Sequence, residues 1–132
     1  RYIGIESPEL YILDSSGEWI INADASGCFA REAAARNREF VEGKEVRLER
    51  DISDRDRYGR LLRYVFYLAE DLSKAGGIEW TMINLQLVEE GYASAATFPP
   101  DVKYADEFVA AERRAREAKR GLWQKCSSAD ER

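Results

Sequence analysis

The chain has 132 residues, of which 45% are hydrophobic and 34% are charged, a composition typical of one soluble globular domain with its own core. Its formal net charge of -5 gives no general attraction for polyanions, so contact with nucleic acid would depend on a local cluster of arginines. The absence of histidine excludes histidine general bases, Ser-His triads and histidine metal sites, which leaves acid–base chemistry to carboxylates, arginine, lysine, tyrosine or cysteine.

The first 21 residues predict a strand and then a hairpin. Residues 1–5 form a short, mostly apolar strand, and residues 6–9 bring an acid, a hydroxyl residue, a proline and a second acid. Two β-prone runs within residues 10–21 flank the turn Asp14–Gly17, which predicts a small hairpin. We expect this hairpin to cover its own apolar residues; the alternative is a flap beside a functional site.

A helix is predicted over residues 28–42. Residues 24–27 give capping and turn signals before it, and Gly43 ends it. Its apolar stripe consists of Phe29, Ala33, Phe40 and Val41. No residue of this helix indicates chemistry.

A hairpin with a highly charged connection is predicted next. Residues 46–50 and 62–66 alternate with the period of two that strands have. The connection crowds aspartates and arginines around Gly59, which permits a sharp turn: Asp51, Asp54, Asp56, Arg55, Arg57 and Arg60. Guanidinium groups bind phosphate bidentately, and Tyr58 beside them can stack or donate a hydrogen bond. The alternative interpretation is an exposed turn that only adds solubility.

Beyond this hairpin the pattern changes to a helix between two short strands. Residues 70–77 read as a polar turn and residues 80–82 as the return of a strand. Residues 82–90 have the apolar spacing of a short helix, with the polar Asn84 inside it. Residues 93–97 predict a last short strand.

The C-terminal part predicts a long helix and a tail. Pro99-Pro100 prevents the last strand from continuing, and residues 101–120 then predict a helix. Its apolar face is formed by Tyr104, Phe108, Ala111 and Ala115, and its outer face mixes arginines with glutamates, as in an ion-paired solvated surface. We expect residues 127–132 to be disordered.

The two cysteines, Cys28 and Cys126, lie far apart in the sequence and lack the spacing of metal ligands. They are either two buried free thiols or a disulfide that anchors the tail after Trp123 to the head of the first helix.

Two motifs far apart in the chain point to one family. Residues 1–9 read Arg-Tyr-Ile-Gly-Ile-Glu-Ser-Pro-Glu, and residues 56–60 read Asp-Arg-Tyr-Gly-Arg. Together they resemble the signatures of the staphylococcal (micrococcal) nuclease family, or thermonucleases. Further fragments agree in the same order, at residues 43–44, 82–84, 90–93 and 119–123. The resemblance covers nearly the whole chain.

The element order predicts an α+β domain, and the resemblance implies an OB-like five-stranded β-barrel with three helices. We expect one domain over residues 1–126 whose first two strands, joined by an acidic turn that carries a calcium ligand in the family, are absent from this chain. Sheet edges and part of the core would then be exposed. Either the chain is a fragment of a longer protein, or upstream residues or a second copy supply the missing strands, or the metal site is incomplete.

The resemblance also implies roles for individual residues. Arg1 and Arg60 would hold the scissile phosphate from two sides and stabilise the charge of a five-coordinate phosphorus. Glu9 would take a proton from, or orient, the attacking water, and Arg57 and Tyr58 would bind a neighbouring phosphate. The matching Asn84 is structural in the family.

The implied metal is calcium. Glu6 and the backbone carbonyl of Ser7 would ligate an ion that acts as a Lewis acid on the phosphoryl oxygen; magnesium suits a site with few ligands and several waters less well. Glu6 is one methylene longer than the aspartate that is usual in the family. Thr97 and Pro99 replace two base-stacking tyrosines of the family's representative, so that function does not carry over.

The resulting hypothesis is a secreted, calcium-dependent hydrolase, an endonuclease of DNA and RNA with little base preference. The alternatives are a catalytically inactive nuclease-like module that binds nucleic acid or protein, and an α+β domain of unrelated function. Because proteins of this kind are commonly exported, the resemblance favours the Cys28–Cys126 disulfide and a secreted, periplasmic or cell-surface location. The chain as given contains no secretion signal and no apolar run long enough to span a bilayer.

Overall fold

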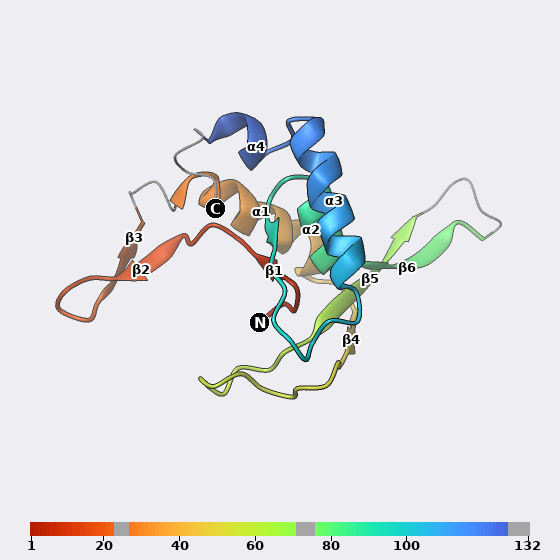
Figure 1. Ribbon diagram of the computed structural model, residues 1–132, viewed down its shortest axis with the longest axis horizontal. Helices are drawn as coiled ribbons and strands as arrows, with labels where there is room; N and C mark the ends of the chain where they lie inside the picture. The colour runs from red at the N-terminus through yellow and green to blue at the C-terminus, as the bar shows by residue number, and fades with distance from the viewer. Residues whose placement is uncertain (23–26, 71–75, 127–132) are drawn as a thin grey trace.

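The computed structural model describes residues 1–22, 27–70 and 76–126. Three helices pack beside a three-stranded antiparallel sheet of order β4-β5-β6 (Figure 1). The helices are α1 (Ala30–Val41), α2 (Ile83–Glu89) and α3 (Ala105–Glu117), and the strands are β4 (Val46–Glu49), β5 (Tyr64–Glu70) and β6 (Ile78–Met82). The predicted α+β class is therefore confirmed.

Two smaller strand pairs complete the sheet structure. β1 (Ile5–Glu6) pairs with β7 (Ser94–Ala95), and β2 (Tyr11–Leu13) pairs with β3 (Trp19–Ile21). Within the described residues these strands form three separate sheets rather than one closed barrel. β4 pairs only with β5 there, and Leu48 on β4 is 54% exposed.

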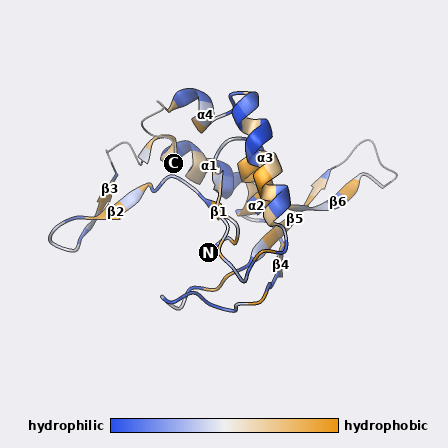
Figure 2. Ribbon diagram, in the orientation of Figure 1, coloured by the Kyte–Doolittle hydropathy of each residue, from blue (hydrophilic) through white to orange (hydrophobic). Residues whose placement is uncertain are grey.

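The main core lies where the helices meet the sheet. Ile83, Leu87 and Val88 of α2 and Phe108, Ala111 and Ala115 of α3 are buried, and the hydropathy colouring shows orange, apolar stretches beside blue, polar ones along α3 (Figure 2). The largest fully buried side chains are Tyr64, Phe108, Ile83, Val88 and Asn84. Burying an aliphatic or aromatic side chain of this size stabilises the fold by about 1.5–3 kcal/mol.

Asn84 is the polar exception in this core, and it connects the first residues of the chain to β5. Its side-chain oxygen accepts from the Val65 N–H (2.8 Å), and its amide donates to the carbonyls of Ile3 (2.9 Å) and Arg63 (3.2 Å). A buried amide that makes all these bonds is stable, whereas the same groups left without partners would be strongly destabilising. The structural role expected for Asn84 agrees with this geometry.

Gly4 allows the chain to change partner within one residue. Before it, Tyr2 bridges to Arg63 in parallel, and after it β1 pairs with β7. Its φ of +84° is a conformation that favours glycine, and a Cβ there would collide with the Phe108 ring. A larger residue at position 4 would displace either the first strand or α3.

The prediction of the long C-terminal helix differs from the structure at both ends. The helix predicted over residues 101–120 is shorter, because the Asp101 carboxylate accepts from the Ser53 N–H (2.8 Å) and residues before Ala105 form turns. It ends before Lys119, which has a positive φ of 52°. A one-turn helix, α4 (Leu122–Lys125), follows and was not predicted.

Among the described residues, no helix combines the length and apolarity needed to cross a membrane.

The hairpin predicted within residues 10–21 is present, but the expectation that it covers its own apolar residues is wrong. β2 and β3 form a two-stranded ribbon that projects from the helical body (Figure 1). Its apolar side chains are largely exposed: Tyr11 (54%), Leu13 (55%), Trp19 (68%), Ile20 (43%) and Ile21 (43%). A two-stranded ribbon has no second layer of its own against which to bury them.

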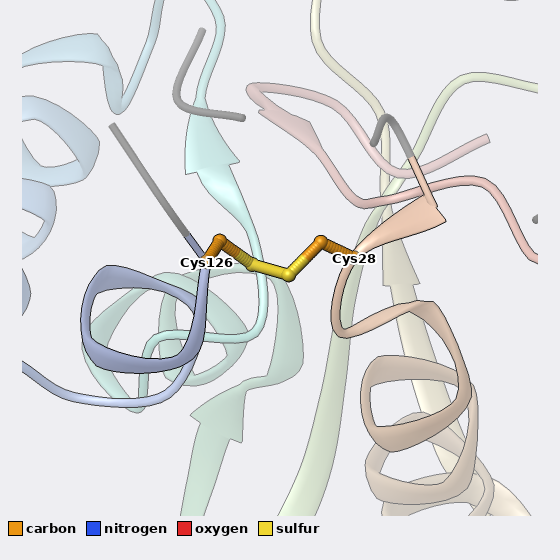
Figure 3. Close-up of a disulfide and its surroundings, with 2 residues drawn as sticks. All are labelled: Cys28 and Cys126. Atoms are coloured by element: carbon orange, nitrogen blue, oxygen red, sulfur yellow. A yellow bond between two sulfur atoms is a disulfide. The ribbon is translucent and has the colours of Figure 1, made fainter. Parts of the chain in front are cut away.

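A disulfide joins the start of the first helix to the end of the last one. The Cys28 and Cys126 sulfurs are 2.05 Å apart, immediately before α1 and immediately after α4 (Figure 3). Beside it, Ala115, Leu122 and Trp123 form a small second core. The bond thus holds α4 against the head of α1. Residues 24–26 and 127–132, for which capping signals and disorder were predicted, lie outside the described residues.

Candidate functional site

The charged connection between β4 and β5 is a tight turn organised by Asp56. One oxygen of its carboxylate accepts from the backbone N–H groups of Tyr58 (2.9 Å) and Arg60 (3.0 Å), and the other accepts from Arg60 Nε (2.7 Å). Gly59, with φ of +82°, provides the left-handed residue that the turn requires. Burial alone would raise the pKa of Asp56, but these hydrogen bonds hold it below its usual value. The carboxylate therefore stays ionised and keeps Arg60 in place.

Three side chains gather at the tip of this turn. Arg57 donates to the Tyr58 hydroxyl (2.8 Å), and the guanidinium carbons of Arg57 and Arg60 lie 5.0 Å and 5.4 Å from the centre of the Tyr58 ring. Tyr58 is 68% exposed. Two guanidinium groups against one aromatic ring form an exposed, positively charged surface that suits phosphate groups.

Arg1 is brought to this turn by strand pairing. The backbone nitrogen of Arg1 donates to the Leu61 carbonyl (2.9 Å), the Arg63 N–H donates to the Arg1 carbonyl (3.2 Å), and the Ile3 N–H donates to the Arg63 carbonyl (3.1 Å). Arg1 and Arg60, far apart in sequence, thus lie close together.

The base of the turn is held by carboxylates that the sequence pattern did not distinguish from solvating charges. Arg63 donates to the Asp54 carboxylate (2.7 Å), which holds the pKa of Asp54 below its usual value. Tyr64 donates to Asp51 (2.6 Å), and burial, followed by this carboxylate, raises the pKa of Tyr64 far above its usual value. The period-two pattern shows that Arg63 and Tyr64 lie on opposite faces, but it carries no information on which aspartate each one meets.

Glu9 lies on a second part of the site, a half-open cavity of about 460 Å³ between the N-terminal segment and α1. Arg1, Ser7, Glu9 and Asn37 provide polar groups around it, and its apolar lining includes Ile5, Ala30, Ala33, Ala34 and Leu87. Arg1 therefore connects the two parts, because it lines the cavity and also pairs with the residues after Arg60. Arg60 itself does not line the cavity.

Asn22 positions Glu9 and was missed by sequence reasoning. It is 7% exposed, its side chain donates to the Glu9 carbonyl (2.9 Å), and its N–H donates to the Leu10 carbonyl (2.8 Å). These bonds close the base of the β2–β3 ribbon and fix the backbone that carries Glu9. The only signal was an asparagine directly after an apolar strand, which is common at turns.

Glu6 and Ser7 follow one another at the end of β1, and both are exposed. Their carboxylate and carbonyl oxygens are of the kind that calcium prefers, so these donors suit the ion, but they supply fewer than the roughly six to eight oxygens that it takes. Across residues 1–22, 27–70 and 76–126, no group of three His, Cys, Asp or Glu side chains is arranged to hold a metal. Water or further residues would have to complete such a shell.

Comparison with known proteins agrees with the two motifs. The family model described as staphylococcal nuclease homologue matches residues 1–125. The thermonuclease of Staphylococcus hyicus is 28% identical over 123 residues, which cover 93% of this chain and 61% of that protein. In Bacillus subtilis (strain 168), the SPbeta prophage-derived endonuclease YokF is 32% identical over 127 residues (95% of this chain, 36% of that protein), and endonuclease YncB is 33% identical over 99 residues (74% and 42%).

The chain thus spans less than two thirds of the length of each of these relatives. The match of the family model nevertheless extends over nearly all of its residues, including both motifs and the elements that bring them together. The chain belongs to the staphylococcal nuclease homologue family.

Proposed function

We propose that this chain is a nuclease domain that hydrolyses phosphodiester bonds in DNA or RNA with little base preference. The observation that carries the proposal is the pairing of residues 1–3 with residues 61–63, which brings Arg1 beside the turn that holds Tyr58 and Arg60. Relatives named thermonuclease and endonuclease support the same class of activity.

The chemistry assigns one task to each charged group. Arg1 and Arg60 bind the scissile phosphate and stabilise the additional negative charge that develops on it during attack. Arg60 uses its Nε for Asp56, which leaves the other N–H donors of the guanidinium for phosphate oxygens. Glu9, exposed at the cavity beside Arg1, accepts a proton from the attacking water or orients it.

Calcium is the proposed cofactor, with Glu6 and the Ser7 carbonyl among its ligands. When bound, the ion would supply Lewis-acid stabilisation of the phosphoryl oxygen. The assignment is supported by the type of ligand at the end of β1, because calcium prefers oxygen atoms.

We further propose that additional strands complete a five-stranded OB-like barrel at the open edge of β4, since Leu48 is exposed there. Upstream residues or a second copy would provide them.

The Cys28–Cys126 disulfide supports a location outside the reducing cytoplasm, so we propose a secreted, periplasmic or cell-surface protein. Disulfides persist in oxidising compartments and are rare in the cytosol of most organisms.

The decisive experiment measures cleavage of single-stranded DNA by the wild-type protein and by the Glu9→Gln variant. Each protein is assayed once with calcium and once with a chelator. Glu9→Gln should reduce kcat by about 10²–10⁴-fold, the range that general acid–base groups contribute, and chelation should abolish cleavage. The matched control is Glu45→Gln, which removes an exposed carboxylate that follows α1 in the sequence. This variant should retain full activity. Equal cleavage by wild type and Glu9→Gln would contradict the assignment. DNA binding without any cleavage would instead favour the inactive binding module.

A further inference from the structure

The cavity beside Arg1 has the construction of a small-molecule site. Its volume of about 460 Å³ falls within the roughly 300–1,000 Å³ typical of such sites. Three alanines of α1, Ala30, Ala33 and Ala34, belong to its apolar lining. Small side chains on this face of the helix leave room for a ligand where larger ones would close the space.

Two side chains at this cavity, Asn37 and Tyr11, have groups that could contact a ligand in the part of the protein that the structure describes. The Asn37 side-chain oxygen already accepts from the Tyr2 hydroxyl (2.6 Å), which orients the amide and leaves its N–H groups as donors. Tyr11, at the base of the β2–β3 ribbon, lines the cavity and is still 54% exposed. A flat ligand that carries hydrogen-bond acceptors would find a stacking surface and a donor here.

The arginines next to the cavity indicate which flat ligands would fit it best. Arg1 lines it and also lies beside the turn that carries Arg60. A ligand with a phosphate at the arginines and a planar, acceptor-bearing ring in the cavity would use both parts at once. A nucleotide has this arrangement, and bases stack on aromatic side chains regardless of their identity.

We propose that this cavity is a nucleobase subsite, which takes the base of the nucleotide whose phosphate Arg1 contacts, with Tyr11 stacking on the ring and Asn37 donating to it. The proposal rests on the nuclease function above. It also explains why the ribbon is placed directly after Glu9: its first residues form one wall of the subsite.

The test measures the contribution of the base to binding. Dissociation constants for uridine 5′-monophosphate and ribose 5-phosphate are determined by calorimetry on wild type, Tyr11→Ala, Tyr11→Phe and Ala34→Phe. Wild type should bind the nucleotide at least about tenfold more tightly than the sugar phosphate, and Tyr11→Ala should reduce this ratio about fivefold to tenfold. Ala34→Phe, which fills the cavity, should have a similar effect, while Tyr11→Phe should retain the ratio.

Leu13→Ala is the matched control, because Leu13 lies on the same ribbon, is similarly exposed at 55%, and does not line the cavity. Its ratio should equal that of wild type. A wild-type ratio near one, or a ratio that neither Tyr11→Ala nor Ala34→Phe lowers, overturns the proposal. If Ala34→Phe fails to fold, the Tyr11→Ala and Tyr11→Phe pair decides alone.

Binding and cleavage separate this proposal from the proposed function. If the protein cleaves DNA but the base adds nothing to binding, only the subsite is wrong. If nucleotide binding shows the expected ratio while Glu9→Gln and wild type are equally inactive on DNA, the nuclease assignment fails and the subsite stands.

Discussion

A single carboxylate organises the charged turn. Asp56 accepts from two backbone N–H groups and from the Arg60 side chain, so the conformation of the turn and the position of the guanidinium depend on the same group. Such an arrangement fixes a flexible arginine before a phosphate arrives, which lowers the conformational entropy lost on binding. Under the proposed function, Asp56 would therefore act as a positioning residue for Arg60.

Removing this carboxylate should impair the site without unfolding the domain. We expect Asp56→Ala to lower kcat/KM about tenfold to hundredfold, since small displacements of a positioned group have effects of this size. Asp56→Asn keeps an oxygen acceptor for the Tyr58 and Arg60 N–H groups. Its kcat/KM should therefore lie between those of wild type and Asp56→Ala. Steady-state kinetics on DNA test the order; full activity in Asp56→Ala would show that Arg60 needs no such support.

The same turn should respond to acid at an unusually low pH. Hydrogen bonds from Arg63 lower the pKa of Asp54, and those to Asp56 outweigh its burial, so both native pKa values lie below the ordinary aspartate value of about 3.9. Their stabilising contribution is complete above that value and is lost as pH falls through the lowered pKa values. An NMR titration of the Tyr58 and Arg60 amides should have its midpoint below about 3.9; a midpoint above it would contradict the geometry.

At the scale of elements, the first strand and α2 are coupled through Asn84. Backbone pairing places residues 1–3 beside residues 61–63. The buried amide at the start of α2 adds bonds to Ile3, Arg63 and Val65. Through this residue the helix determines where Arg1 lies relative to Arg60.

Loss of the Asn84 amide should therefore destabilise the whole domain. Asn84→Ala leaves several buried backbone groups without partners, and we expect the free energy of unfolding to fall by about 2–4 kcal/mol. Urea denaturation measures the change, with Gln124→Ala, exposed on α4, as a control within about 0.5 kcal/mol of wild type. Hydrogen exchange at the Val65 amide should accelerate in the same variant, and unchanged stability would mean that water replaces the amide.

At the scale of the molecule, a covalent cross-link fixes the last helix, and an edge strand bounds the main sheet. The disulfide connects residues 98 positions apart in sequence and holds α4 against α1, whereas β4, in the part of the chain that the structure describes, pairs on one side only, with β5. A cross-link between residues 98 positions apart restricts the unfolded ensemble strongly, because loop-closure entropy increases with loop length.

Reduction of the disulfide should lower stability substantially. For a loop of this length we expect the free energy of unfolding to decrease by about 2–5 kcal/mol. Urea denaturation with and without reductant gives the value, and the Cys28→Ser, Cys126→Ser double variant should match the reduced protein and be insensitive to reductant. A midpoint that does not move under reducing conditions would show that the bond contributes nothing to the native state.

The sequence by itself determined the features that depend on neighbouring residues. The period-two runs on either side of Gly59 became β4 and β5, and Ala33, Phe40 and Val41 of the predicted stripe lie in α1, whereas Phe29 precedes that helix with a positive φ. Gly43 follows the end of the helix. The two motifs also identified the family. Side-chain alternation and turn chemistry act over a few residues, so a single sequence suffices to read them.

Only the tertiary structure decided the features that depend on contacts distant in sequence. The pairing of Arg1 with Leu61, the bond from Asn22 to the Glu9 backbone and the exposure of Tyr11 and Trp19 on the ribbon all depend on which elements pack together. No local pattern contains this information, because an apolar residue on a strand is covered only if another layer reaches it. The cavity beside Arg1 arises for the same reason: the alanines of α1 leave space only because the N-terminal segment passes opposite them.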